Sequence, residues 1–150
     1  MTPSVVIRPA EDFEFDWCAQ LMAGNDPWLT YKCPVDWCRN VLNWPGSSLY
    51  IADAGQASGF ILLHRRGFLG SPYIAAVAVA EELRGNGIGG AMLDFAERAF
   101  SGTRHVFLCV SSFNPRAQQL YERHGYGKMG ELQDFIADGF TEFLMCKRLP

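Results

Sequence analysis

The sequence has no hydrophobic run close to the length of a membrane-spanning helix, and it has no excess of positive charge. A membrane span needs roughly 20 consecutive apolar residues, and the 150 residues contain no such run. Its 13 Lys and Arg residues are outnumbered by 16 Asp and Glu residues, which gives a formal net charge of −3. Proteins that bind nucleic acids usually carry a basic surface that neutralises phosphates. We therefore expect neither a membrane nor a nucleic acid among the partners.

The cysteines and histidines lack the spacing of a metal site or a disulfide framework. The chain has five cysteines, an odd number, and none of them forms a C-x-x-C pair. The three histidines are scattered along the chain, so no metal is expected. The first residues are typical of a strand that runs into a turn, not of a signal peptide. These features predict reduced thiols and a cytoplasmic location.

The hydrophobic pattern predicts one mixed α/β domain over residues 1–150, because 49% hydrophobic residues exclude intrinsic disorder and the length suits a single domain. The expected element order is β-α-α-β-β-β-α-β-α-β-β, with a central sheet of about seven strands flanked by about four helices. The strands are expected at residues 5–7, 49–52, 58–65, 73–79, 106–110, 130–136 and 141–146, and the helices at 12–23, 34–42, 88–99 and 114–125. Residues 66–72 are predicted to form a loop.

The most informative segment is the glycine-rich run Gly85-Asn86-Gly87-Ile88-Gly89-Gly90 at the expected start of a helix. As a string it matches the dinucleotide fingerprint G-x-G-x-x-G, which would suggest a nucleotide-dependent oxidoreductase. That fingerprint requires its first glycine directly after the first strand of a βαβ unit, and here the loop comes late in the chain. Closely spaced glycines at a helix N-terminus instead allow backbone N–H groups to converge on an anion. The alternative is a connection that only turns the chain.

Two motifs resemble those of a known family, the GNAT (Gcn5-related) N-acetyltransferases. Residues 84–89, Arg-Gly-Asn-Gly-Ile-Gly, are similar to the acetyl-CoA motif Q/R-x-x-G-x-G/A. Residues 114–126, which begin Asn-Pro-Arg-Ala and end Gly-Tyr, are similar to the second signature N-x-x-A-x-x-L-Y-x-x-x-G-F. The apolar segment 73–79 resembles the central fourth strand of that family, and the expected element order also matches, so the resemblance covers essentially the whole chain.

The resemblance implies acetyl-CoA as cosubstrate and assigns residues to it. The end of the fourth strand would hold the pantetheine arm through its backbone, the glycine loop would hold the pyrophosphate, and an N–H near Val79 would polarise the thioester carbonyl. Tyr121 would protonate the departing CoA thiolate, although it is also suited to packing in the core. The residues expected to bind the cosubstrate are Val77, Ala78, Val79, Arg84, Gly85, Asn86, Gly87, Ile88, Gly89, Gly90 and Asn114.

The general base is not evident from the sequence, because the strand 73–79 contains no acid and Cys109 stands where some peptide N-terminal acetyltransferases have a Glu. Glu142, Asp134 and His64 are candidates by strand alternation, and a chain of water molecules is an equal alternative. Cys109 itself is interpreted as a small buried apolar residue and not as a nucleophile.

The acceptor pocket is expected to lie between the segment joining the first two helices and the last hairpin loop. Asp26, Trp28 and Tyr31 would suit an ammonium group; equally, Trp28 would belong to the core and Asp26 to a turn. We expect acetyl-CoA-dependent transfer to a primary amine, on a small molecule or a peptide, by direct attack on the thioester. The alternative is a non-catalytic acyl-CoA-binding or regulatory module. Aromatic residues near Trp28 and Trp44 would suit a homodimer interface.

Overall fold

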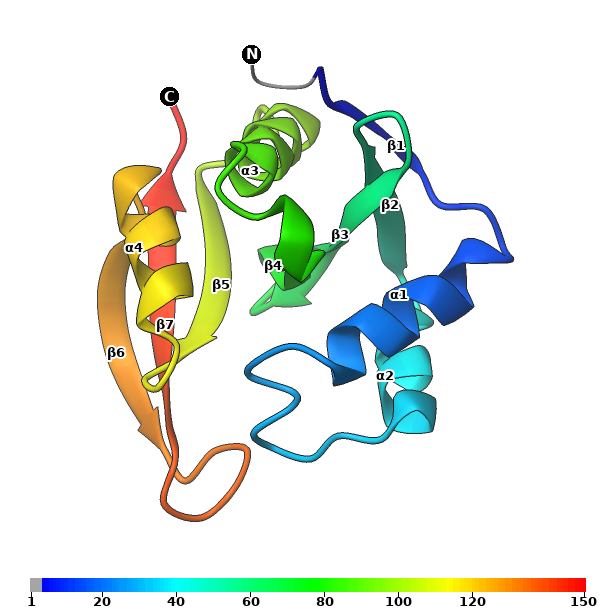
Figure 1. Cartoon of the computed structure of the whole chain (residues 1–150). Coiled ribbons are helices and arrows are strands. Elements are labelled where there is room, and N and C mark those ends of the chain that lie inside the picture. Colours follow the sequence, from blue (N-terminus) through cyan, green and yellow to red (C-terminus); the bar gives the residue numbers. More distant parts are fainter. Residues whose placement is uncertain (1–3) are drawn as a thin grey trace.

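A seven-stranded sheet runs through the molecule in the order β1-β2-β3-β4-β5-β7-β6 (Figure 1). The computed structural model describes residues 4–150; the first three residues of the expected domain lie outside this part. Only β4 and β5 run parallel among the neighbouring strands of the described chain. The strands are β1 (Val6–Pro9), β2 (Ser47–Asp53), β3 (Ala57–Phe68), β4 (Ser71–Val79), β5 (His105–Ser111), β6 (Gly127–Gln133) and β7 (Thr141–Arg148).

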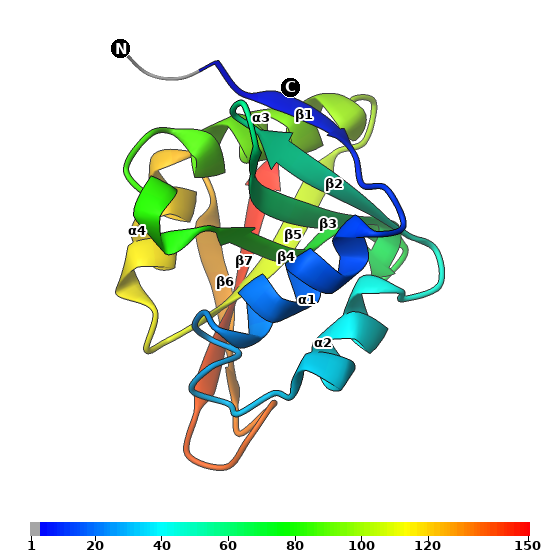
Figure 2. The same ribbon diagram turned by 45° about the vertical axis from the view of Figure 1, so that its right-hand side comes forward.

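In the described part of the chain, four α-helices cover the two faces of the sheet. Helices α1 (Glu14–Ala23) and α2 (Val35–Leu42) pack on one face, and α3 (Ile88–Ala99) and α4 (Pro115–Arg123) pack on the other (Figures 1 and 2). A short 3-10 helix, η1 (Glu81–Leu83), precedes α3. Helices α1, α2 and α3 bury residues at helical spacing, for example Ile88, Met92 and Ala96 on α3. Among residues 4–150, no helix combines the length and the apolar character that a membrane crossing requires.

The fold class and the element order expected from the sequence are confirmed, whereas several boundaries differ, most of all at the turn between β3 and β4 and at both ends of β6. The loop expected at residues 66–72 is a two-residue turn, because β3 continues to Phe68 and β4 begins at Ser71. Leu69 and Gly70 have φ angles of 50° and 76°, the left-handed conformation that tight hairpin turns require. The strand expected at 130–136 is β6, which ends at Gln133 because Asp134 turns the chain with a φ of 56°.

An extra residue in β4 separates this strand from β5. Leu62 pairs with Ala76 whereas Leu63 pairs with Ile74, so Ala75 is a bulge. The parallel pairing between β4 and β5 is confined to Tyr73 with Phe107 and Ile74 with Leu108, directly before the bulge. Beyond that point the two strands diverge, and within residues 4–150 the edge of β4 that faces β5 carries no strand partner. The sheet therefore opens at the ends of β4 and β5, between its two layers of helices.

Candidate active site

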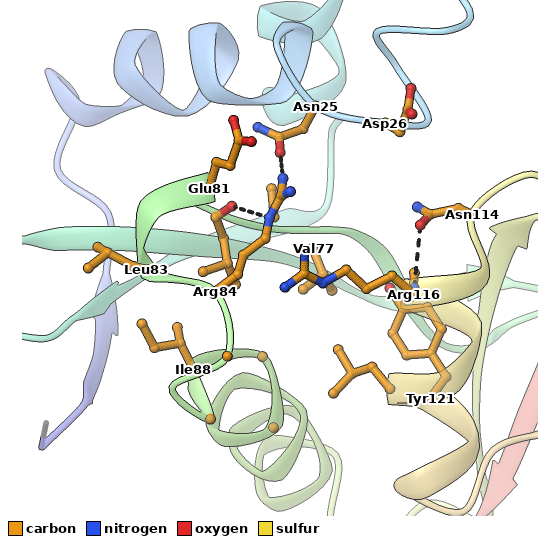
Figure 3. Close-up of a pocket in the computed structure, with 18 of the residues that line it drawn as sticks. Asn25, Asp26, Val77, Glu81, Leu83, Arg84, Ile88, Asn114, Arg116 and Tyr121 are labelled. Carbon is orange, nitrogen blue, oxygen red and sulfur yellow. Dashed lines mark hydrogen bonds between the residues drawn. The ribbon is translucent and has the colours of Figure 1, made fainter. Parts of the chain in front are cut away.

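A cavity of about 480 Å³ lies at the opening between β4 and β5 (Figure 3). It is lined by the end of β4 and the glycine loop that follows it, by α4 and by the segment after α1, so three parts of the chain that lie far apart in the sequence meet there. The lining residues are Gly24, Asn25, Asp26, Leu29, Val77, Ala78, Val79, Glu81, Leu83, Arg84, Gly85, Gly87, Ile88, Gly89, Gly90, Asn114, Arg116, Ala117, Leu120, Tyr121 and Arg123. Of the residues assigned to the cosubstrate, only Asn86 is absent from this lining.

The glycine loop presents a row of free backbone donors to this cavity. Gly85 and Gly87 have φ angles of +82° and +78°, which residues with side chains rarely adopt, and a Cβ on either would point into open space. Within residues 4–150, the backbone N–H groups of residues 85–90 donate to no other residue. They lie at the positive end of the α3 dipole. The loop therefore has the donors, the space and the field that an anionic group such as a pyrophosphate requires.

Gly89 and Gly90 are needed for helix packing, a role that was not predicted from the sequence. A Cβ on Gly89 would come within 2.9 Å of Leu120 Cδ2, and one on Gly90 within 2.9 Å of His124 Cε1. Both glycines therefore allow α3 to approach α4 closely. The density of glycine in this segment reflects two needs, a left-handed turn before the helix and close helix packing within it.

Arg84 joins the glycine loop to the end of α1 (Figure 3). Its guanidinium donates to the side-chain oxygen of Asn25, and its Nε donates to the carbonyl of Val79 at 3.4 Å. Asn86 instead turns its side-chain amide back to the carbonyl of Leu83, at 3.0 Å. Arg84 therefore spans the mouth of the cavity, whereas the Asn86 side chain stabilises the loop.

Asn114 and Tyr121 bring the second motif to the same cavity. The Asn114 side chain caps α4 by accepting a hydrogen bond from the N–H of Ala117 at 3.4 Å, and Pro115 occupies the first turn. Tyr121 is buried against Tyr126, with ring centroids 6.2 Å apart. Burial raises the pKa of the Tyr121 phenol to about 12, so the group stays protonated at neutral pH. Its hydroxyl donates to no other group within residues 4–150.

Two basic residues at the cavity did not emerge from the sequence. Arg116 and Arg123 lie on the face of α4 that also carries Leu120, at positions i, i+4 and i+7, and all three line the cavity. Arg116 extends from α4 toward the middle of the cavity (Figure 3). The helical spacing could have predicted both residues, because it places the two guanidinium groups on the helix face that carries the family signature.

The candidates for the general base lie in three different places. His64 contacts the carbonyl of Pro45 at 3.1 Å and packs on the Trp44 ring, beside the start of β4 and away from the cavity. Asp134 lies in the turn after β6, where its side chain accepts the N–H of Gly139. Glu142 on β7 is buried but does not line the cavity. Its Oε2 accepts hydrogen bonds from Tyr31, at 2.5 Å, and from Ser111.

In the segment between α1 and α2, Trp28 belongs to the core, as one alternative expected, whereas Asp26 lies at the cavity, as the other expected. Trp28 is half-buried and packs against the core under α1 and α2. Asp26 is exposed, lines the cavity and accepts hydrogen bonds from the backbone and hydroxyl groups of Thr30. No group of three metal-ligating side chains is present in the described part of the chain.

Comparisons with known proteins agree with this arrangement. The profile of the Acetyltransferase (GNAT) family matches residues 11–126. An uncharacterized N-acetyltransferase of Methanocaldococcus jannaschii is 33% identical over 107 residues, which cover 67% of this chain and 66% of that protein, just under two thirds of its length. The chain belongs to the GNAT acetyltransferase family.

Solved structures share the fold over most of the chain. Arabidopsis thaliana NAA60 in complex with a bisubstrate analogue has a TM-score of 0.80 at 19% identity, over 98% of this chain and 100% of that one. An aminoglycoside 6'-N-acetyltransferase complexed with coenzyme A has a TM-score of 0.76 at 17% identity, over 97% and 98%. Nourseothricin acetyltransferase is 26% identical, with a TM-score of 0.62 over 71% of this chain and 67% of that one.

Proposed function

We propose that this protein transfers an acetyl group from acetyl-CoA to a primary amine, by direct attack of the amine on the thioester. The observation that carries the proposal is the row of free N–H donors at residues 85–90, which opens into the cavity between β4 and β5. A pyrophosphate is an anion of the right kind for these donors. Family membership and the CoA-containing complexes of fold relatives support the same ligand.

The remaining parts of acetyl-CoA have suitable partners along the cavity. The free edge of β4 at Val77, Ala78 and Val79 offers backbone groups to the amides of the pantetheine arm, as a further strand would. Arg84, Arg116 and Arg123 suit the phosphates, because a guanidinium binds a phosphate through charge-assisted hydrogen bonds. Asn114 lies where the two strands open, next to the expected path of the arm.

Tyr121 is the proposed general acid of the reaction. As the C–S bond breaks, the thiolate needs a proton, and a phenol with a raised pKa is a stable proton source at neutral pH. A backbone N–H near Val79 would stabilise the negative charge that develops on the carbonyl oxygen. Both groups belong to the walls of the cavity, so acid and oxyanion donor are fixed on the scaffold before the substrates arrive.

Calorimetric titration with acetyl-CoA, free CoA and NAD tests the binding step. We expect acetyl-CoA and CoA to bind and NAD not to bind; absence of binding by any CoA species would overturn the proposal. The second step is a transfer assay with a panel of amines, in which Tyr121→Phe should lower kcat by roughly 100-fold or more at unchanged acetyl-CoA affinity. Tight CoA binding without transfer to any amine would instead favour a non-catalytic acyl-CoA-binding module.

A further inference from the structure

Glu142 is a buried carboxylate with one oxygen fixed and the other free. Its residue surface is 6% exposed, and Oε2 accepts the hydroxyl groups of both Tyr31 and Ser111. Within residues 4–150, Oε1 accepts no hydrogen bond. His124 Nδ1 is the one fully buried side-chain polar atom in that range without a partner, so Oε1 retains access to open space. A buried carboxylate oxygen in this state is suited to a donor from outside the chain.

This carboxylate lies at the same opening of the sheet as Tyr121, but on the other face. Ser111 pairs with Glu142 across β5 and β7, three residues beyond the last pairing of β5 with β4. Val110, the residue before Ser111, points into the core that contains Tyr121. Because side chains alternate along a strand, Ser111 and Glu142 point to the face covered by α1 and α2. A thioester held in the opening would therefore have Tyr121 on one side and Glu142 on the other.

Three aromatic rings hold the Tyr31 hydroxyl in place. Tyr31, Phe113 and Phe140 come from three different loops, and each pair of rings packs edge-to-face with centroids 5.3 Å apart. Burial, with the Glu142 hydrogen bond as a further cause, raises the pKa of Tyr31 to about 12. Tyr31 therefore stays a hydrogen-bond donor at neutral pH. The cluster ties the segment between α1 and α2 to β7 and forms an apolar wall beside the carboxylate.

Two uncharged titratable groups lie near Glu142 on this face of the sheet. Tyr73 on β4 and Cys109 on β5 lie beside each other, and burial raises the pKa of both. The nearby Glu142 carboxylate adds to the raised pKa of these two groups and of Tyr31. Glu142 is the acidic side chain of this cluster, and a carboxylate is a natural partner of a cation.

We propose that Glu142, Tyr31 and Ser111 form the acceptor subsite, and that it takes a primary alkylammonium group. Glu142 Oε1 binds the ammonium and is the base; Tyr31 and Ser111 are positioning residues that hold Oε2. The inference rests on the proposed acetyl transfer and extends it to the class of acceptor. The apolar rings beside the carboxylate suit the alkyl carbon that carries the nitrogen.

Every proton released in the proposed step has an acceptor. Glu142 takes one proton from the ammonium and passes it to solvent, and the nitrogen lone pair then forms the C–N bond to the thioester carbon. The C–S bond breaks, and the thiolate takes the Tyr121 hydroxyl proton. The second proton lost by nitrogen returns to the Tyr121 oxygen through solvent. The products are the N-alkyl acetamide, the CoA thiol and one proton.

Binding of n-butylamine to the CoA-loaded protein, followed by NMR, tests the subsite without turnover. We expect butylammonium to shift signals of the Tyr31 and Ser111 region and n-butanol not to. Glu142→Gln, which keeps the length and shape of the side chain but replaces one carboxylate oxygen by an uncharged amide NH2, should weaken butylammonium binding by roughly tenfold or more, since one charged hydrogen bond is lost. Glu131→Gln on the neighbouring strand, an exposed position, is the matched control. Equal butylammonium affinity in the wild type and Glu142→Gln would overturn the inference.

Transfer kinetics separate the positioning role from a merely structural one. Tyr31→Phe keeps the three rings and removes only the hydroxyl, so kcat for butylamine should fall by about tenfold while the acetyl-CoA affinity stays unchanged. An unchanged kcat in Tyr31→Phe would remove its positioning role. The same NMR titration without CoA separates the two proposals: if the wild type binds butylammonium through Glu142 but binds no CoA species, the proposed function fails and the amine subsite stands.

Discussion

Gly89 on α3 lies directly against Leu120 on α4, so closely that a Cβ on the glycine would come within 2.9 Å of Leu120 Cδ2. The glycine loop leads into α3, and the second signature motif contains α4. The contact between the two helices therefore brings both motifs to one cavity. The glycines before α3 have another role. Since Gly85 and Gly87 face open space, substitutions at the two pairs should have different effects.

Gly87→Ala should reduce both stability and cosubstrate binding. A left-handed φ costs a residue with a Cβ about 1 kcal/mol, and the new methyl group would occupy the space in front of the free N–H groups. Gly102→Ala is the matched control, because Gly102 also has a left-handed φ, +90°, with open space around its Cβ, and does not line the cavity. Urea unfolding should show similar losses for both variants, and calorimetry should show weaker acetyl-CoA binding for Gly87→Ala alone. Equal acetyl-CoA affinities in the two variants would argue against a phosphate position in front of the loop.

Arg116→Ala and Arg123→Ala should each weaken acetyl-CoA binding by roughly tenfold, with a loss that shrinks at high salt, because the lost contact is a charge-assisted hydrogen bond to a phosphate. Binding of acetylpantetheine, which lacks the phosphates, should stay unchanged. Arg98→Ala serves as the control, since Arg98 lies in the last turn of α3 and does not line the cavity. A similar loss with acetylpantetheine would show that these arginines act on the fold.

Tyr121 should make the protein lose stability at alkaline pH. Burial raises its pKa from the ordinary 10.0 to about 12, so the folded state keeps the phenol proton at pH values where the unfolded chain has released it. The free energy of unfolding should therefore fall as the pH rises from about 10 toward 12, and it should fall less steeply in Tyr121→Phe. Urea titrations at a series of pH values between 9 and 11 measure both slopes. Identical slopes would mean that the phenol is more hydrated than its burial indicates.

Arg8 stabilises the junction of β1 and α1 without contacting the cavity. It donates to both oxygens of Glu14, at 2.7 and 2.9 Å, and to Asp53 at 3.2 Å, and the Glu14 side chain is 7% exposed. Arg8→Ala leaves that carboxylate nearly buried without its cation and should cost about 2 kcal/mol. Arg39→Ala, which breaks exposed pairs with Asp16 and Asp36, should cost less than about 1 kcal/mol.

The same pair predicts an acid dependence. The Arg8 hydrogen bonds lower the pKa of Glu14 below its ordinary 4.5, so the pair stabilises the fold fully above that pH and loses its contribution as the pH falls through the lower, folded-state value. Chemical denaturation at pH 7 and at decreasing acidic pH should show the difference between wild type and Arg8→Ala shrinking. A constant difference would assign the effect of Arg8 to packing alone.

Local signals made most of the fold predictable. Residues 84–89 predict a turn and the start of a helix, and the residues that follow predict its apolar face. The structure has α3 at this place. The end of β6 was missed because Phe135 and Ile136 continue an apolar pattern in the sequence, yet both are exposed in the turn that Asp134 begins. Apolar residues at a loop tip resemble a strand to any argument from periodicity.

The contacts of Glu142 could not be predicted from the neighbouring residues in the sequence. The contact between Tyr31 and Glu142 joins residues 111 positions apart, and it depends on a loop without regular structure that reaches across the sheet. Strand alternation suggested that Glu142 could reach the cleft; in the structure Glu142 is buried and does not line the cavity, and nothing in the sequence indicated what fixes its Oε2. The packing roles of Gly89 and Gly90 were equally hidden, since they follow from how two separate helices meet.

The bulge at Ala75 also exchanges the two faces of one strand. Ile74 belongs to the core under α3 and α4, whereas Ala76 and Ala78 belong to the core under α1 and α2. Deleting Ala75 would turn the side chains of Tyr73 and Ile74 to the opposite faces of the sheet. Alternatively, it would turn the side chains of all later β4 residues to the opposite faces. The position thus tolerates substitution far better than a change in length, and a family alignment that inserts a gap here would misassign inward and outward residues over the rest of β4.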